Sequence, residues 1–106
     1  MKNKRKQFSH ENQLSTAADF AIRIFELISE SKLNDDNLLV ISKNGKQVIF
    51  DLIECDGEYI AFGESEDNHI RIHINDITAF GCSNLICGQN VVYIDTKDDS
   101  FQIRNA

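Results

Sequence analysis

Residues 44–62 read NGKQVIFDLIECDGEYIAF, and this stretch decides the fold class. It contains the pairs Asn44-Gly45 and Asp56-Gly57, which are strong hairpin signals because these residue types tolerate positive φ. Between the two pairs, residues 47–55 alternate apolar and polar side chains, as a half-buried strand does. Residues 59–64 continue the alternation after the second pair. The stretch therefore predicts antiparallel strands joined by tight turns.

Short strands with local connections are expected over most of the remaining chain. The segment His69–Ile74 alternates cleanly, and an acidic turn is expected before it at residues 64–68. Residues 81–90 contain small residues around one apolar pair and are expected to be irregular. The expected strands are residues 38–42, 47–55, 59–64, 69–74, 77–80, 91–95 and 101–104. Six or seven such strands predict a strongly bent antiparallel meander or a partly closed barrel.

One N-terminal helix is expected at about residues 9–32, which makes the fold class α+β. Thr16 followed by Asp19 resembles a capping box near its start. Its polar side chains form a narrow stripe at helical spacing, residues 15, 19, 23, 26 and 30, and nearly all others are apolar. So wide an apolar arc exceeds what one sheet face needs. Either the sheet wraps around the helix, or a second copy of the chain covers part of it.

We take the second alternative as a prediction, a two-fold dimer through the helix. Small residues near its start would let two helices approach closely. The residues expected at this contact are Ala17, Phe20, Ala21, Ile24, Leu27 and Ile28.

The strand alternation also predicts the inner face of the sheet, with Phe25 and Ile28 of the helix packed on it. That face is expected to contain Phe50, Leu52, Ile60, Phe62, Ile70, Ile72, Ile74, Val91 or Val92, and Phe101.

Length and charge set bounds on organisation and partners. The 106 residues fit one domain, expected at residues 9–106 after a disordered basic tail at residues 1–8. From Phe8 onward, 7 basic residues stand against 17 acidic ones, a net charge of −10. Such a body repels nucleic acid and membrane phosphates and attracts a protein partner with a basic surface.

The sequence also predicts a cytoplasmic location. It contains no apolar run near the roughly 20 residues of a membrane helix, and residues 8–16 are too polar for an export signal. The three cysteines, Cys55, Cys82 and Cys87, are an odd number and fit reduced thiols.

No motif predicts catalysis, a cofactor or a metal site. His69 and His73 share a face of one strand but lie about 13 Å apart, too far to bind one ion. Cys82 and Cys87 lack the spacing of zinc ligands or of a redox pair. No glycine-rich phosphate loop or nucleophile elbow is present. The chain is therefore expected not to be an enzyme.

Two surface features predict contacts with other molecules. His69, Arg71 and His73 would project from one strand face, either as an ordinary solvated face or as a small cationic surface for an anion or an acidic partner. Leu85 and Ile86 lie in a loop of small residues and would form an apolar contact if exposed.

Residues 58–104 resemble bacterial pleckstrin-homology and GRAM-type domains. The resemblance rests on GEYIAFG, HIRIHINDITAFG and NVVYIDTKDDSFQIRN, a strand of alternating isoleucines followed by a hairpin that closes on a Phe-x-Ile strand. It implies a curled antiparallel sheet packed on one helix. That family closes its barrel with a C-terminal helix, whereas the helix expected here is N-terminal, as in Sm-type domains. No functional residue of either family carries over.

Three functions follow from these patterns. The first is a non-enzymatic protein-interaction or regulatory module, with the helix-mediated homodimer as one form. The second is a small acidic inhibitor, such as an immunity protein or nucleic-acid mimic, that covers a basic nuclease or defence enzyme. The third is a barrel that binds a small ligand through His69, Arg71 and His73 or through its mouth.

Overall fold

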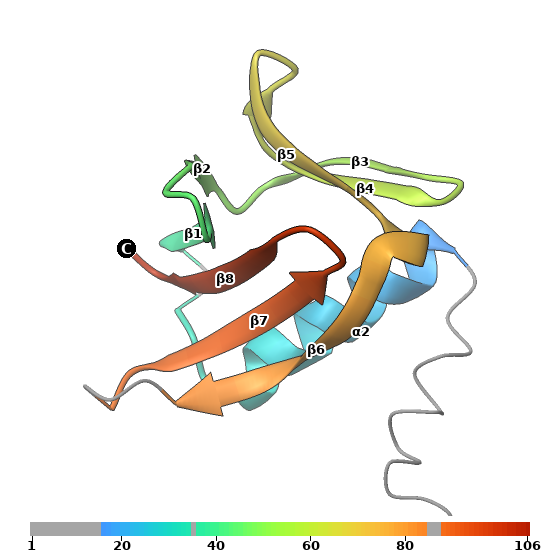
Figure 1. Cartoon of the computed structure of the whole chain (residues 1–106). Coiled ribbons are helices and arrows are strands. Elements are labelled where there is room, and N and C mark those ends of the chain that lie inside the picture. The colour runs from blue at the N-terminus through green and yellow to red at the C-terminus, as the bar shows by residue number, and fades with distance from the viewer. Residues whose placement is uncertain (1–15, 35, 85–87) are drawn as a thin grey trace, which may run out of the picture.

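The computed structural model describes residues 16–34, 36–84 and 88–106. One helix packs on two antiparallel sheets, one of five strands in the order β2-β1-β8-β7-β6 and one of three in the order β3-β4-β5 (Figure 1). The elements are α2 (Ala17–Glu30), β1 (Leu38–Ser42), β2 (Gln47–Ile49), β3 (Leu52–Asp56), β4 (Tyr59–Ser65), β5 (Asn68–His73), the 3₁₀ turn η1 (Ile74–Asp76), β6 (Ile77–Asn84), β7 (Asn90–Thr96) and β8 (Ser100–Asn105).

The predicted α+β class and antiparallel pairing are confirmed. The strand number is wrong, since the described chain has eight strands rather than six or seven, and they form two sheets without closing into a barrel. The expected strand at residues 47–55 divides at Phe50 and Asp51. The Phe50 N–H donates to the Leu38 carbonyl at 3.0 Å, whereas the Asp51 carbonyl accepts from the Gly63 N–H at 2.9 Å. Adjacent residues thus bond to different sheets.

The β6 strand is longer than the sequence indicates. Residues 81–84 were expected to be irregular, but Gly81 pairs with Tyr93 and Cys82 with Val92 in the β6–β7 ladder. The neighbouring strand supplies hydrogen-bond partners that local composition cannot reveal. Residues 85–87 lie outside the described chain, as do residues 1–15, where the basic tail and the start of the expected helix fall.

Hydrogen bonds join the start of the helix to the three-stranded sheet and its end to the five-stranded sheet. At its start, the Thr16 hydroxyl accepts from the Asp19 N–H at 3.1 Å, as the capping pattern predicts, and the Ala17 N–H donates to the Gly57 carbonyl in the β3–β4 turn at 2.9 Å. At its end, the Asn90 side-chain amide donates from β7 to the Ser31 carbonyl at 3.0 Å. The helix therefore spans from the three-stranded to the five-stranded sheet.

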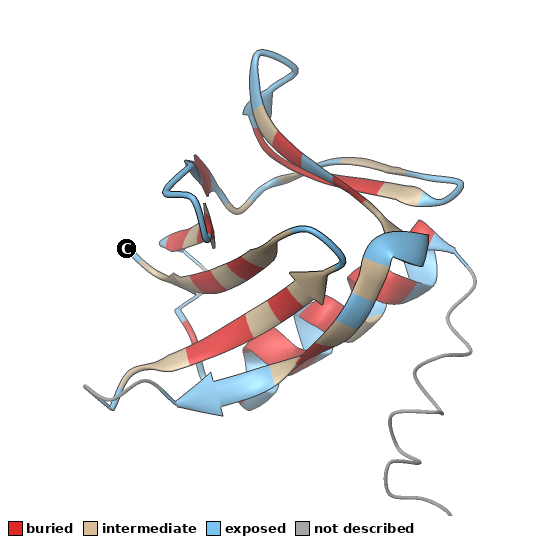
Figure 2. Cartoon of the chain, viewed as in Figure 1, coloured by how far each residue is buried: buried red, intermediate tan, exposed pale blue. Residues whose placement is uncertain are grey.

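The core lies between the helix and both sheets (Figure 2). Phe62, 1% exposed, stacks on Phe50 with ring centroids 5.1 Å apart, and Phe20 meets Phe80 edge-on at 5.0 Å. The predicted inner face is confirmed. Ile60, Phe62, Ile70, Ile72, Phe101 and, of the two valines, Val92 are buried in the core, and Phe50, Leu52 and Ile74 pack on it as partly buried residues.

Two predictions about the helix need correction. Phe25 is 48% exposed and reaches only the edge of the Phe50 ring, because it lies about 100° around the helix from the buried Ile24. All six residues assigned to a dimer contact are buried by the chain's own sheets, so a homodimer would have to use another surface. These residues are Ala17, Phe20, Ala21, Ile24, Leu27 and Ile28.

The described residues contain no helix long and apolar enough to cross a membrane.

Replacing Phe62 by alanine should lower the free energy of unfolding by about 3–5 kcal/mol, because the substitution leaves a large cavity beside Phe50. Urea denaturation measures this change. Ile22→Ala is the control, since Ile22 is 61% exposed and should lose less than about 0.5 kcal/mol. A loss below about 1 kcal/mol for Phe62→Ala would show that Phe62 does not lie in the core.

A charge placed on the buried face of the helix should unfold the chain. Ile24→Asp buries an unpaired carboxylate, so we expect loss of the helical circular dichroism signal and aggregation. Ile22→Asp introduces the same charge on the exposed face and should remain folded. A folded Ile24→Asp variant that changes only its mass in light scattering would restore the dimer prediction.

Candidate binding surface

The outward-facing side chains of the three-stranded sheet form the candidate site. Along β5, Ile70 and Ile72 are buried, and the alternation turns His69, Arg71 and His73 to the opposite face. This face, formed by Glu54, Tyr59, Ala61, His69, Arg71 and His73, is called the outer face below.

An ion pair crosses the middle strand of the outer face. Glu54 on β3 and Arg71 on β5 are both in register with Ala61 on β4. Because Ala61 has only a methyl group, the two long side chains meet above it. Arg71 Nε donates to Glu54 Oε1 at 2.9 Å, and Nη2 donates to Oε2 at 3.1 Å. Together they cover Ala61, which is only 1% exposed.

Further contacts hold the guanidinium group of Arg71. It lies over the Tyr59 ring, 3.7 Å from the centroid, an arrangement that favours a cation. The hydrogen bonds and charge of Arg71 lower the pKa of the Glu54 carboxyl below its ordinary value, although partial desolvation opposes this shift. The bonds to Glu54 in turn raise the pKa of Arg71.

His73 is held from both ring nitrogens. Its Nδ1 accepts the Asn75 N–H at 3.0 Å, which starts the η1 turn, and its Nε2 lies 3.0 Å from Glu58 Oε1. An accepting Nδ1 places the ring proton on Nε2, which can then donate to the carboxylate. The ring also meets Tyr59 edge-on at 4.6 Å.

Of the two alternatives for this face, these contacts favour an ordinary solvated face over a small cationic surface. The charge of Arg71 is balanced by Glu54, and His73 is bonded to Glu58. The sequence pattern groups His69, Arg71 and His73 correctly on one face. It does not reveal the acidic partners of Arg71 and His73, because Glu54 lies on β3 and Glu58 lies in the β3–β4 turn. The Asp56-Gly57 turn contains a signal that could have located Glu54, since it fixes the register of β3 against β4.

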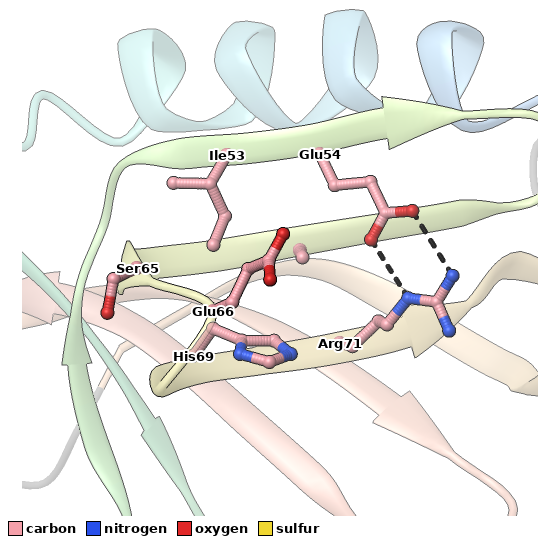
Figure 3. A pocket seen from close by; sticks show the side chains of 7 residues that line it. Ile53, Glu54, Ser65, Glu66, His69 and Arg71 are labelled. Atoms are coloured by element: carbon pink, nitrogen blue, oxygen red, sulfur yellow. Dashed lines mark hydrogen bonds and ion pairs between the residues drawn. The ribbon is translucent and has the colours of Figure 1, made fainter.

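A hollow of about 650 Å³ opens beside the ion pair (Figure 3). Ile53 contributes apolar surface, and the Glu54–Arg71 pair, which covers Ala61, lies at one side. The His69 ring and the Glu66 carboxylate point into the same space. This volume lies within the range of about 300–1,000 Å³ that is usual for ligand pockets.

Gly63 sets how closely β5 approaches β4 at His69, which lines the hollow. It is in register with His69 and has φ of +149°, where a β-carbon would lie 2.4 Å from the Asn68 carbonyl oxygen and 2.7 Å from His69 Cα. Only glycine allows β5 to approach β4 so closely. The approach places His69 against the sheet, where its Nδ1 atom is buried without a hydrogen-bond partner.

A second, smaller hollow of about 360 Å³ lies at the C-terminal end of α2. Its exposed Cys82 thiol is 2.9 Å from the Ser31 hydroxyl and 3.6 Å from the Leu27 carbonyl oxygen. These contacts complete the end of the helix, and Asn84 and Asn90 bond to each other beside them. The side chains that line this hollow therefore bond to the end of the helix.

The remaining predicted surface residues, Leu85 and Ile86, lie outside the described residues, as does Cys87. Across residues 16–34, 36–84 and 88–106, no group of three or more His, Cys, Asp or Glu residues is placed to hold a metal ion.

Comparison of the chain with protein-family models, curated proteins and solved structures gives no significant match. The resemblance to pleckstrin-homology and GRAM-type domains therefore stays a prediction from the sequence.

The ion pair makes a prediction about pH. Because the folded-state pKa of Glu54 is depressed, its stabilising effect is present above pH 4.5 and is lost as the pH falls through the folded-state pKa. Carbon-13 NMR titration of the Glu54 carboxyl should give a midpoint below 4.5, and Arg71→Met should raise it.

Lys97→Met is the control for this titration, since it also removes one positive charge but from a side chain that pairs with Asp76. It should leave the Glu54 midpoint unchanged. A Glu54 midpoint that does not respond to Arg71→Met would contradict the ion pair.

Proposed function

We propose that the chain is a non-enzymatic protein-interaction module and that its outer face binds a partner with a basic surface. The observation that carries this proposal is the hollow on the outer face, where the exposed apolar side chain of Ile53 lies beside the exposed carboxylate of Glu66. An apolar centre with a polar surround is the usual arrangement at protein interfaces.

The charge of the three-stranded sheet supports a basic partner. Residues 52–73 contain six acidic residues and one basic residue, Arg71. Glu54 neutralises Arg71. The excess negative charge of this segment is therefore carried by the other five acidic residues, Asp56, Glu58, Glu64, Glu66 and Asp67. Concentrated charge of one sign steers a partner of the opposite sign and speeds association.

The contacts of the outer face support binding over catalysis. Arg71 is fixed between Glu54 and Tyr59, and both ring nitrogens of His73 have partners. Side chains fixed in this way present a preformed surface, which reduces the entropy lost on association.

The same charge supports a second candidate, an inhibitor that covers the basic surface of an enzyme. The two functions differ in what binding does to the partner. A purified partner that is an enzyme and loses activity at an equimolar amount of the chain would identify an inhibitor. A partner whose activity is retained would identify an adaptor or regulatory module.

Two matched variants test the proposed face. Ile53 and Ile49 are both exposed isoleucines, at 37% and 45%, but Ile53 lines the hollow and Ile49 lies on β2 of the other sheet. Ile53→Lys should weaken binding of a partner captured by the unmodified chain by about tenfold or more, whereas Ile49→Lys should not.

Captured proteins are quantified by mass spectrometry and then purified to measure binding at low and high salt. Affinity should fall as the salt concentration rises. Equal capture by the two lysine variants, or affinity that does not respond to salt, would contradict the proposed function.

A further inference from the structure

We propose that the hollow over Ala61 receives one long basic side chain, an arginine or a lysine, from the protein partner. This inference rests on the proposed function, because it specifies which chemical group of a basic partner the outer face recognises. It follows from the charge balance, the apolar surface and the unpartnered polar atoms of the hollow.

The charge balance inside the hollow is negative. Arg71 and Glu54 neutralise each other through two hydrogen bonds. Within the described chain, Glu66 has neither an ion pair nor a side-chain hydrogen bond, and Figure 3 shows its carboxylate pointing into the hollow. A side chain of the partner that enters the hollow therefore lies near one carboxylate, that of Glu66, whose charge is not neutralised by an ion pair, and this carboxylate attracts a cation.

A second acceptor lies next to Glu66. His69 Nδ1 is buried and has no hydrogen-bond partner, and a neutral imidazole has one ring nitrogen that accepts. Leaving a buried polar atom unsatisfied is unfavourable, so an N–H group that donates to it would gain free energy. A guanidinium or ammonium group offers several donors for Glu66, and it would reach His69 Nδ1 once the imidazole ring turns toward the hollow, because that atom is buried in the unbound chain.

The apolar part of the hollow suits the rest of such a side chain. Ile53, which is 37% exposed, presents carbon surface beside the two acceptors. Arginine and lysine carry three or four methylene groups below the charge, and these methylenes pack readily on apolar surface. A short or rigid cation would leave this surface uncovered.

An anionic guest fits the same residues poorly. It would have to draw Arg71 away from Glu54 and from the Tyr59 ring, 3.7 Å below the guanidinium carbon. It would also lie beside the Glu66 carboxylate, and like charges at close range repel each other.

The test is an NMR titration of the nitrogen-15-labelled chain with N-acetyl-arginine methylamide and N-acetyl-lysine methylamide. The apolar probe is N-acetyl-norleucine methylamide, and the anionic probe is the glutamate analogue. We expect at least one basic probe to shift the backbone amides of Ala61 and His69 in a saturable way, and the norleucine and glutamate probes to shift them less. The comparison of arginine with lysine identifies the preferred guest.

Two variants separate the hollow from the general charge of the surface. Glu66→Gln and Glu64→Gln make the same charge change at exposed positions two residues apart, but only Glu66 lines the hollow. Glu66→Gln should weaken binding of the basic probe by about two- to fivefold, the range of a partly exposed ion pair, whereas Glu64→Gln should change it little.

Equal weakening by the two variants, or equal shifts with basic and norleucine probes, would overturn the inference. The proposed function would still stand if the partner remained sensitive to Ile53→Lys. Conversely, saturable binding of a basic probe together with equal partner capture by Ile53→Lys and Ile49→Lys would leave the hollow as a cation site and reject the proposed function.

Discussion

The apolar face of α2 is the constraint on which the rest of the structure depends. Neither sheet surrounds the core alone, and α2 packs against strands of both. Its first turn is bonded to the β3–β4 turn through Ala17 and Gly57, and its last turn to β7 through Asn90. Because one helix face is shared in this way, the helix helps to set the position of the three-stranded sheet relative to the five-stranded sheet, together with the direct contact of β2 with β4 and the stacking of Phe50 on Phe62.

Burial of the inner face of the three-stranded sheet determines which side chains form its outer face. Ile60, Phe62, Ile70 and Ile72 turn inward to meet the helix, so the alternate residues of the same strands must turn outward. On β4 these alternate residues include Ala61 and Gly63, whose small size leaves space above the middle strand. The ion pair of Glu54 and Arg71 spans part of that space, and the hollow occupies the part beside it.

Local patterns in the sequence were sufficient for the features that depend on neighbouring residues. The Asn44-Gly45 and Asp56-Gly57 turns, the helix cap at Thr16 and the inward set of β5 were predicted because each follows from backbone conformation or side-chain periodicity within a few residues. The very wide apolar arc of the helix was also informative, since both sheets cover most of it, although Ile22 and Phe25 remain exposed.

Features that depend on pairing between distant strands could not be predicted in this way. The switch between sheets at Phe50 and Asp51 leaves the alternation unchanged and alters only which strands supply hydrogen bonds. The extension of β6 to Asn84 needs β7 beside it. The charge of Arg71 seemed free because its partner lies 17 residues away, and only the register of three strands brings Glu54 to it.

Native-state hydrogen exchange on Ile24→Val tests the shared helix most directly. The lost methyl group should lower the free energy of opening by about 0.5–1.5 kcal/mol. If one helix face holds both sheets, amides of β4 and of β7 should lose protection by the same amount. Protection that falls in one of these strands and stays unchanged in the other would contradict the account, because the two sheets would then be stabilised independently of each other.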